Sequence, residues 1–355
     1  MRKPLATVII VTYNSMQIKG IVERSIRSVL SLAYRPTEVI IVDNGSNDGS
    51  FEFIKSIVDS SPKDINVKLL KLSQNYGFAI ANNIAFSKRD NRSKYIALIN
   101  DDLVPEPDSL SKLIEFMETN ESVGGVQGKI LTWDSKRIDS AGCVLTQDGN
   151  TYAIGRSLPA NSCNKIIPIT YSDGAFSVYR VKAIENCGGL FLPYFFMYGD
   201  DYELGIRLWR CGYKIVYVPI IAGCHYRSAT INSAKHIPTK YWVSKAMFSV
   251  QVMYDDLWFI HLLPRFLTTP LRSLMRVENI TIRGFVDGIF LGLKLRKKAK
   301  ELRGAGIREP RIKIDIFSQY CELIGLFLSH GWSASEVIYF LMCRRLGVNY
   351  PQKTS

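Results

Sequence analysis

The sequence predicts an α/β protein with a Rossmann-like, mostly parallel central sheet and helices on both faces. Two observations predict this fold class. Over the first hundred residues, short runs of β-branched and other apolar residues alternate with amphipathic segments of helical spacing. Each apolar run ends in polar residues, as buried parallel strands do at the edge of a sheet. Alternation of this kind needs crossover helices, which cover both faces.

The elements follow one another from the N-terminus. Residues 6–14 (ATVIIVTYN) have the continuous apolar pattern of a buried strand. Ile18–Leu32 is predicted to be a helix because Ile18, Val22 and Ile26 fall on one face. The same reasoning predicts strands at 38–46, 67–73 and 94–102, and helices at Ser50–Val58, Ala79–Phe86 and Ser109–Thr119.

The next part of the chain is less regular. Val123–Asp173 carries many Gly, Asp and Asn residues between short apolar runs, so we expect irregular structure with short strands. Residues 172–180 resume a strand, and Val181–Asn186 forms a short helix. A helix that begins at Asp200 and a strand that leads to His225 complete this part.

Composition narrows the class of partner. The formal net charge of +13 favours an anionic partner, such as nucleic acid, a nucleotide-bearing substrate or an acidic membrane surface. The basic residues concentrate after about residue 240 rather than beside stacking aromatics on a sheet, so we do not expect nucleic acid. The seven cysteines form no C-x-x-C pair, which argues against a zinc or redox motif and favours a reducing cytosol.

We predict two domains, an α/β domain at residues 1–232 and a helical, basic, amphipathic region at 233–355. In the second, Lys240–Tyr254 is predicted to be an amphipathic helix, and Ile316–Leu328 and Ala334–Leu346 are predicted to be closing helices.

The basic region allows two interpretations. Its mixture of Leu, Phe and Ile with Lys and Arg suits an acidic membrane surface, with Trp242, Trp258 and Phe259 at the interface. It equally suits a helical subdomain with a solvated basic face. No apolar run reaches the roughly 18 residues of a spanning helix, and we find no signal peptide. We therefore expect a cytoplasmic protein, peripheral at the inner face of the membrane.

Polar clusters follow the first two predicted strands. Thr12, Tyr13 and Asn14 end the first, and Asp43 ends the second before the turn-forming sequence NGSNDG. A carboxylate at such a strand end accepts hydrogen bonds from a base N–H or a ribose hydroxyl. The turn interpretation holds equally and does not exclude a ligand. The sequence lacks G-x-G-x-x-G after the first strand and has no P-loop motif, which disfavours dinucleotide-binding and P-loop ATPase folds.

Carboxylates also gather later in the chain. Asp101 and Asp102 follow the fourth predicted strand, where they suit Mg²⁺ or Mn²⁺ shared with substrate phosphates, or simply a helix cap or solvated loop. His225 is a candidate imidazole ligand, although a lone histidine is more often structural. Asp200 and Asp201 begin a helix, where acidic residues commonly satisfy free N–H groups and the helix dipole.

The ordered set TVIIVTYN, IIVDNGSNDGS, QNYGFAIANNIA, YIALINDD, GAFSVYR and GDDYELGIRLWRCGYKIVYVP…H resembles the inverting family 2 glycosyltransferases, in their rhamnosyltransferase-like branch. The resemblance covers about residues 5–230. It implies a GT-A fold and transfer of a sugar from a nucleotide sugar, with UDP or dTDP as the nucleotide, to an acceptor hydroxyl. The acceptor would be a glycan or a lipid-linked glycan.

The resemblance also implies roles for residues. Asp201 matches the family's catalytic base, and Asp200 lies beside it. Asp102 resembles the last carboxylate of the metal motif, which reads N-D-D here because Asn100 takes its first position, and His225 resembles a late histidine that completes the metal shell. The nucleotide and donor would contact the following residues: Thr12, Tyr13, Asn14, Asp43, Asn75, Gly77, Asn83 and Asp101.

Asp173, Gly174 and Arg227 are candidates for the acceptor side, although Asp173 also suits a turn cap. Two other functions stay open. A nucleotidyltransferase also needs a nucleotide cradle and a carboxylate-bound Mg²⁺, but it usually has a basic Gly-rich phosphate loop that TVIIVTYN lacks. A catalytically silent nucleotide- or glycan-binding protein would not need Asp102, Asp201 and His225 together.

Overall fold

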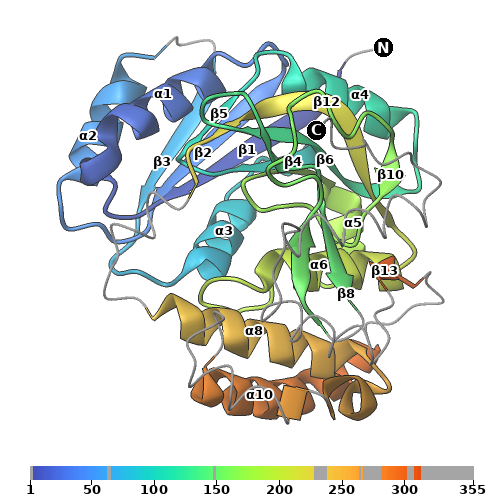
Figure 1. The fold of residues 1–355 in the computed structure, drawn as a ribbon. Coiled ribbons are helices and arrows are strands. Elements are labelled where there is room, and N and C mark those ends of the chain that lie inside the picture. The colour runs from blue at the N-terminus through green and yellow to red at the C-terminus, as the bar shows by residue number, and fades with distance from the viewer. Residues whose placement is uncertain are drawn as a thin grey trace.

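The computed structural model describes residues 3–61, 65–146, 149–227, 238–263, 265–266, 281–301 and 308–312. A central sheet lies between two layers of helices, and a helical pair packs below the lower layer (Figure 1). The strands of the central sheet are β1 (Leu5–Thr12), β2 (Thr37–Asp43), β3 (Asn66–Lys71), β4 (Ser93–Ile99), β5 (Leu103–Pro105), β6 (Val123–Thr132), β7 (Ile138–Ser140), β10 (Ile167–Pro168), β11 (Phe176–Arg180) and β12 (Lys214–His225).

A small second sheet and the helices complete the described chain. The small sheet contains β8 (Cys143–Thr146), β9 (Thr151–Ala153) and β13 (Arg311–Ile312). The helices are the 3-10 turn η1 (Met16–Ile18), α1 (Lys19–Leu30), α2 (Ser50–Asp59), α3 (Phe78–Ser87), α4 (Ser109–Glu118), α5 (Val181–Asn186), α6 (Asp200–Arg210), α8 (Thr239–Tyr254) and α10 (Ile282–Glu301).

The central sheet has a parallel half and a mixed half. Its order is β10-β12-β6-β11-β4-β1-β2-β3, with β5 paired to β12 and β7 paired to β6. Strands β4, β1, β2 and β3 are parallel, as predicted. Strand β11 runs antiparallel to both β4 and β6, whereas β6 and β12 are parallel. The α/β class is confirmed, and the antiparallel β11 makes the sheet mixed.

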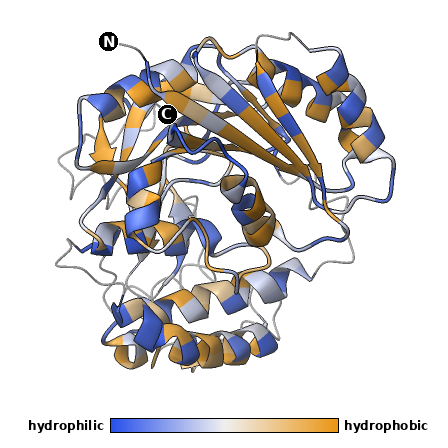
Figure 2. Ribbon diagram, turned by 180° about the vertical axis from the view of Figure 1, so that it is seen from behind, coloured by the Kyte–Doolittle hydropathy of each residue, from blue (hydrophilic) through white to orange (hydrophobic). Residues whose placement is uncertain are grey.

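Side-chain alternation along the strands builds a core on each face of the sheet. In β1, Ala6, Val8 and Ile10 join the core that packs on α1, α2 and α4, whereas Ile9 joins the core that packs on α3, α5 and α6. Both faces of the strands are therefore apolar, which Figure 2 shows as largely hydrophobic ribbons within the sheet. The helices on both faces confirm the predicted layering.

The sequence interpretation of Val123–Asp173 missed a central strand. Strand β6 lies between β11 and β12 and is buried almost throughout. Its glycines suggested turns, but they make room for neighbours instead: a Cβ on Gly125 would lie 2.8 Å from the Tyr179 ring, and one on Gly124 would lie 2.6 Å from Tyr213 Cβ. The short strands expected there do occur, as β7, β8 and β9.

Helix α8, predicted at Lys240–Tyr254, packs on the α/β domain. Its residues Ala246, Val250 and Met253 join the same core as α6. Helix α10 then packs on α8 through glycines spaced four residues apart, Gly284, Gly288 and Gly292. A Cβ on any of them would lie within 2.7 Å of an α8 atom, so the two backbones approach closely.

The structure leaves part of the predicted C-terminal organisation outside the described residues. The proposed boundary after residue 232 falls in 228–237, and Ile316–Leu328 and Ala334–Leu346 fall in 313–355. The two-domain division therefore stays a prediction. In the described ranges, no helix is both long and apolar enough to span a bilayer.

Candidate active site

The sheet topology places a cavity at the carboxyl ends of the parallel strands. The chain passes from β1 to β2 on one side and later returns to β4 on the other side of β1, which makes a topological switch point. A cavity of about 310 Å³ opens there. Of the residues predicted from sequence, it is lined by Thr12, Tyr13, Asn75, Gly77, Asp101, Asp102, Asp173, Gly174, Asp200, Asp201, His225 and Arg227.

The ends of β1 and β2 form one side of this site. Thr12 and Asp43 are register partners at the last position of their strands. Asp43 is fully buried and is not among the cavity-lining residues; its Oδ2 accepts a hydrogen bond from Ser46 N at 3.2 Å. Burial raises the pKa of Asp43, and within the described chain its Oδ1 has no hydrogen-bond partner. Because Asp43 is buried outside the cavity wall, the structure supports no direct contact between its carboxylate and a ligand in the cavity.

Asn14 has a structural role in this part of the chain. It adopts a left-handed conformation with φ of 48°, its N–H donates to Ser46 Oγ, and its Oδ1 accepts from Asn47 N at 3.0 Å. The residue holds the β1–α1 loop against the β2–α2 loop and does not line the cavity. Tyr13, its neighbour, does line it.

The loop before α3 forms the next part of the wall. Asn44, which the sequence analysis did not single out, donates from Nδ2 to Asn75 Oδ1 at 3.0 Å and accepts from Tyr76 N at 3.0 Å. Gly77 has φ of 84°, and a Cβ there would lie 2.3 Å from Phe196 O. Only glycine fits this approach, which joins the loop before α3 to the loop before α6.

Asn83 does not lie at the cavity. Its Nδ2 donates to Phe191 O at 2.8 Å, and its Oδ1 accepts from Phe191 N at 3.0 Å. Both polar atoms of its amide are thus used to hold the 190s loop on α3. The structure supports a positioning role for Asn83 and no direct contact with a ligand in the cavity.

Asp102 and His225 lie together at the far end of β4. Residue 225 pairs with Leu103 of β5, and His225 Nε2 lies 3.0 Å from Asp102 Oδ1. Both side chains are buried. Asp101 instead accepts a hydrogen bond at Oδ2 from Ser15 Oγ at 2.8 Å, which ties it to the β1–α1 loop on the donor side.

This pair fits a divalent ion. A hard cation such as Mg²⁺ or Mn²⁺ binds carboxylate and imidazole ligands, fills its other positions with water and substrate phosphates, and needs few protein ligands. Two potential ligand atoms 3.0 Å apart suit adjacent positions around one ion. Among the described residues, no group of three or more His, Cys, Asp or Glu side chains is arranged to hold a metal by itself.

An unpredicted carboxylate supports His225 from behind. Asp139 Oδ2 lies 2.9 Å from His225 Nδ1. Burial alone would lower the pKa of His225, but its hydrogen bonds to Asp102 and Asp139 raise that pKa to about 9. A cation bound at Nε2 would take the place of the proton there.

Asp200 and Asp201 begin α6, as predicted, and both line the cavity. Burial raises the pKa of Asp201 well above its usual range, and the nearby Asp200 and Asp173 carboxylates raise it further. Burial also raises the pKa of Asp200. Asp201 Oδ1 accepts a hydrogen bond from Tyr202 N at 2.8 Å, which fixes the side chain at the helix N-terminus.

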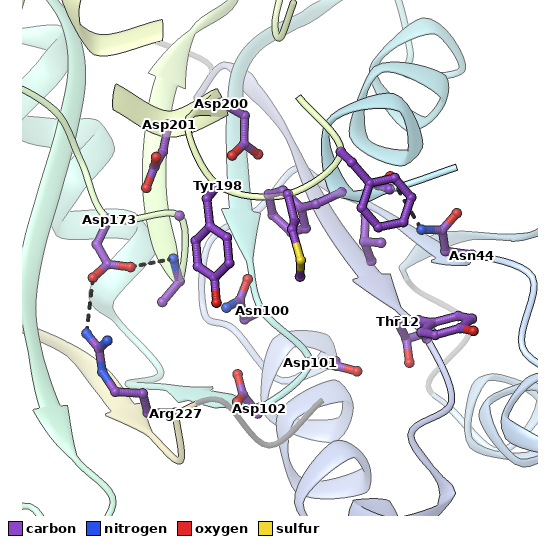
Figure 3. A pocket seen from close by; sticks show the side chains of 18 of the residues that line it. Thr12, Asn44, Asn100, Asp101, Asp102, Asp173, Tyr198, Asp200, Asp201 and Arg227 are labelled. Atoms are coloured by element: carbon purple, nitrogen blue, oxygen red, sulfur yellow. Dashed lines mark hydrogen bonds and ion pairs between the residues drawn. The ribbon is translucent and has the colours of Figure 1, made fainter. Parts of the chain in front are cut away.

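Asp173 and Arg227 lie beside this pair. Arg227 Nη2 is 3.6 Å from Asp173 Oδ2, and Asp173 Oδ1 accepts from Ala175 N at 3.0 Å. Asp173 therefore caps a turn and also lies in the cavity wall. In Figure 3, Asp173, Asp200 and Asp201 lie on one side of the cavity, Thr12 and Asn44 lie on the other, and Asp101 and Asp102 lie below.

The remaining lining residues carried weaker sequence signals. Phe196, Met197 and Tyr198 precede the Gly-Asp-Asp sequence and line the cavity, with Tyr198 directed into it (Figure 3). Phe196 also stacks on Trp242 of α8, with ring centroids 5.2 Å apart. Only their position next to the acidic pair marked them.

Comparisons with known proteins identify the family of the chain. The model of the family described as glycosyl transferase family 2 matches residues 7–188, just over half of the chain. An uncharacterized glycosyltransferase from Haemophilus influenzae is 31% identical over 200 residues, which cover 52% of this chain and 75% of that protein. An N-acetylglucosaminyl-diphospho-decaprenol L-rhamnosyltransferase from Mycobacterium tuberculosis is 26% identical over 227 residues, which cover 58% of this chain and 72% of the relative.

Solved structures support the fold. The crystal structure of GalNAc-T7 with UDP, GalNAc and Mn²⁺ matches with a TM-score of 0.57 at 13% identity, over 92% of this chain and 57% of that one. At this identity the likeness concerns the fold alone. Together with the family match, these findings show that the chain belongs to glycosyl transferase family 2 and is a glycosyltransferase with the GT-A fold.

Proposed function

We propose that this enzyme transfers a sugar from a UDP- or dTDP-sugar to an acceptor hydroxyl in a single displacement that inverts the anomeric centre. One observation carries the proposal. Asp201, a carboxylate of raised pKa, lines the same cavity as the Asp102–His225 pair and the end of β1. A base, a cation site and a nucleotide-sized crevice are what such a reaction needs.

Asp201 is the proposed general base. Inversion needs one in-line attack by the acceptor oxygen on the anomeric carbon, and the hydroxyl proton must leave as that bond forms. A carboxylate whose pKa is raised by burial accepts this proton more readily than an ordinary one. The N-terminus of α6 holds Asp201 in place through its Tyr202 N–H contact.

The donor would lie across the ends of β1 and β4. Thr12, Tyr13 and Asn75, which line the cavity, would contact the nucleotide. Asp102 and His225 would hold Mg²⁺ or Mn²⁺. A bound ion of this kind supplies positive charge that neutralises the departing diphosphate, so no protein acid is needed on the leaving side.

The acceptor would approach from the side of Asp173, Gly174 and Arg227. The guanidinium of Arg227 lies in the cavity wall beside Asp173 and would pair with a phosphate of the acceptor. The name of the mycobacterial relative specifies a diphospho-decaprenol acceptor. We propose an acceptor of the same class here, a glycan linked through diphosphate to a lipid, as in the synthesis of cell-surface polysaccharide.

A lipid-linked acceptor makes contact with a membrane useful, and the C-terminal helices offer a surface for it. Helix α10 is apolar on its outer side as well as on the side that packs on α8, with Phe290 68% exposed. The same surface carries exposed Lys294 and Lys297. Other large apolar side chains exposed nearby are Leu257, Phe259, Ile260, Leu263, Ile282, Val286 and Leu293.

We propose that this surface binds the anionic inner face of the cell membrane peripherally, because apolar side chains insert between headgroups while lysines contact acidic lipids. The aromatic anchors differ from those expected: Phe259 is exposed, but Trp242 and Trp258 are half-buried. Trp242 instead stacks on Phe196 at the cavity.

A donor screen tests the transfer reaction. Purified protein is incubated with UDP-, GDP- and dTDP-sugars in Mn²⁺, Mg²⁺ or EDTA, and nucleoside diphosphate release is measured with and without short-chain lipid diphosphate glycans. The proposal expects release from one donor that is lost in EDTA. Nucleotide binding in all conditions without any transfer, even with acceptor, would favour a catalytically silent binding protein. Exchange of pyrophosphate into a nucleoside triphosphate would favour a nucleotidyltransferase.

A vesicle assay tests the membrane contact. The double variant Phe290→Ser/Leu293→Ser should sediment with vesicles containing phosphatidylglycerol about tenfold less than wild type, because two apolar side chains no longer insert. Ile166→Ser is a matched control, since Ile166 is equally an exposed apolar residue but lies outside the C-terminal helices. Equal sedimentation of all three proteins would contradict the proposed surface.

A further inference from the structure

We propose that Asp139 is a positioning residue of the transfer reaction, which fixes His225 on the metal side of the cavity and Arg227 on the acceptor side. The inference rests on the proposed function. Nothing in the sequence around Asp139 marks it, because it lies in the least regular part of the chain and 86 residues from His225. Its geometry nevertheless places it behind both residues.

Each oxygen of Asp139 has its own partner. Oδ2 lies 2.9 Å from His225 Nδ1, and Oδ1 accepts a hydrogen bond from Arg227 Nε at 2.5 Å. The Asp139 side chain is 5% exposed, so its carboxylate is shielded from bulk water. A buried carboxylate with two basic partners forms strong, directional hydrogen bonds.

The sheet holds these residues in a fixed frame. Asp139 belongs to β7, which pairs with β6, and β6 in turn pairs with β12 so that Thr132 is opposite His225. On its other side, His225 is opposite Leu103 of β5, the residue after Asp102. Three strand pairings thus set the positions of Asp102, His225 and Asp139, and the side chains need little reorganisation.

Asp139 determines which nitrogen of His225 faces the cation site. An ionised carboxylate only accepts hydrogen bonds, so Nδ1 must carry the proton that points to Asp139. Nε2 then faces Asp102 Oδ1 at 3.0 Å, where both would be ligands of one ion. Carboxylates that orient a ligating histidine in this way typically contribute about 10- to 100-fold to metal affinity.

The other oxygen of Asp139, Oδ1, positions Arg227 on the acceptor side of the cavity. Arg227 has φ of 59°, an uncommon conformation for a residue other than glycine, and Asp139 and Asp173 hold its guanidinium from two directions. Asp173 N donates to Gln127 Oε1 at 2.6 Å, so Asp173 is itself fixed. A continuous chain of contacts therefore runs from Asp102 through His225, Asp139 and Arg227 to Asp173, beside Asp201.

A double-mutant cycle on metal affinity tests the contact between Asp139 and His225. Mn²⁺ affinity is measured in the presence of UDP, or of the nucleoside diphosphate that the donor screen identifies, by calorimetry and by the Mn²⁺ paramagnetic resonance signal. Asp139→Ala should weaken Mn²⁺ binding about 10- to 100-fold. In the His225→Ala background the same substitution should have little further effect, because its target is gone.

A double-mutant cycle on the kinetics of transfer tests the contact between Asp139 and Arg227. Asp139→Ala should raise KM for the acceptor as Arg227→Ala does, and the two effects should not add in the double variant. Asp139→Asn keeps one oxygen that accepts hydrogen bonds, so residue 139 should hold only one of its two partners, His225 or Arg227. The loss of Mn²⁺ affinity should then be intermediate. Asp134→Ala is the matched control, because Asp134 lies in the same β6–β7 hairpin and its carboxylate accepts hydrogen bonds from Thr132 and Lys136 within that hairpin.

The outcomes separate this inference from the proposed function. Wild-type protein that binds no Mn²⁺ with nucleotide and transfers no sugar would reject the proposed function itself. Wild-type activity, with Asp139→Ala folded and equal to wild type in Mn²⁺ affinity and acceptor KM, would reject the role of Asp139 alone. Additive effects in both cycles would also reject it. If Asp139→Ala does not fold, Asp139→Asn decides by the same two measurements.

Discussion

Arg207 and Glu203 form an ion pair inside the protein, on the same helix as the proposed catalytic base. The two side chains are 1% and 0% exposed, and Arg207 Nε lies 2.9 Å from Glu203 Oε1. Arg207 also donates to the carbonyl oxygens of Cys187, Gly189 and Leu190. Together these contacts fix α6, and with it Asp201, against the loop after α5.

Removing the arginine should therefore destabilise the fold strongly. Arg207→Ala leaves Glu203 buried without its charge partner, which should lower the free energy of unfolding by about 3–5 kcal/mol. Urea unfolding followed by circular dichroism measures the change. Arg27→Ala is the matched control, because Arg27 and Glu23 form an exposed pair of the same spacing. Comparable losses for both variants would show that burial is not the cause.

The proposed base should reduce stability at neutral pH. Because burial raises the pKa of Asp201 in the folded state, the folded protein holds a proton that the unfolded chain releases. Stability from this group therefore falls as pH rises from the ordinary carboxyl pKa, about 4, through the raised one. At pH 8, Asp201→Asn should unfold at a higher temperature than wild type, with a free energy of unfolding larger by about 0.5–2 kcal/mol. This gain in stability should shrink toward pH 4.

A gain that is independent of pH, or a loss at pH 8, would contradict that account of Asp201. Differential scanning calorimetry across the pH range decides between these outcomes. Glu52→Gln serves as a control, because Glu52 is exposed and its pKa is lowered by hydrogen bonding, so it should show no such gain.

The pH dependence of the reaction should respond to Asp200. Its charge raises the pKa of Asp201, so Asp200→Asn should lower that pKa. Activity requires Asp201 to be ionised, and the acid limb of the kcat/KM profile should therefore move to lower pH. Asp173→Asn should move it in the same direction, since Asp173 also raises the pKa. A limb that stays in place in both variants would mean that another group titrates there.

Gly77 should be required for donor binding. Alanine there would need φ of 84° and would place its Cβ 2.3 Å from Phe196 O, which forces apart two loops that line the cavity. We expect Gly77→Ala to weaken nucleotide binding at least tenfold by calorimetry. Gly49→Ala isolates the backbone strain, because Gly49 has φ of 92° but open space around it. Equal affinity in Gly77→Ala and wild type would place the donor elsewhere.

The sequence was enough to predict the helices and strand ends that depend on a local pattern of residues. Val181–Asn186 was predicted with its observed bounds, and the helix at Asp200 begins as expected. The polar ends of β1 and β4 meet at one edge because parallel strands share their direction, so Thr12, Asp101 and Asp102 were found without structural knowledge. These inferences depend only on periodicity and strand direction.

What the sequence could not supply depends on packing between distant segments. The glycines of β6 fit against Tyr179 and Tyr213, which a local pattern cannot show. Asp139 acquires its partners only through the β7–β6–β12 pairing. Asn83 lies in a motif associated with the donor, yet its amide holds the Phe191 backbone.

The most direct test is the rate of sugar transfer by Asp201→Asn on the donor that the screen identifies. With donor affinity measured by calorimetry on the same samples, the account predicts that kcat falls by about 10²–10⁴-fold while the donor Kd stays within a fewfold of wild type. A variant that transfers sugar within a fewfold of the wild-type rate would contradict the assignment of Asp201 as the base.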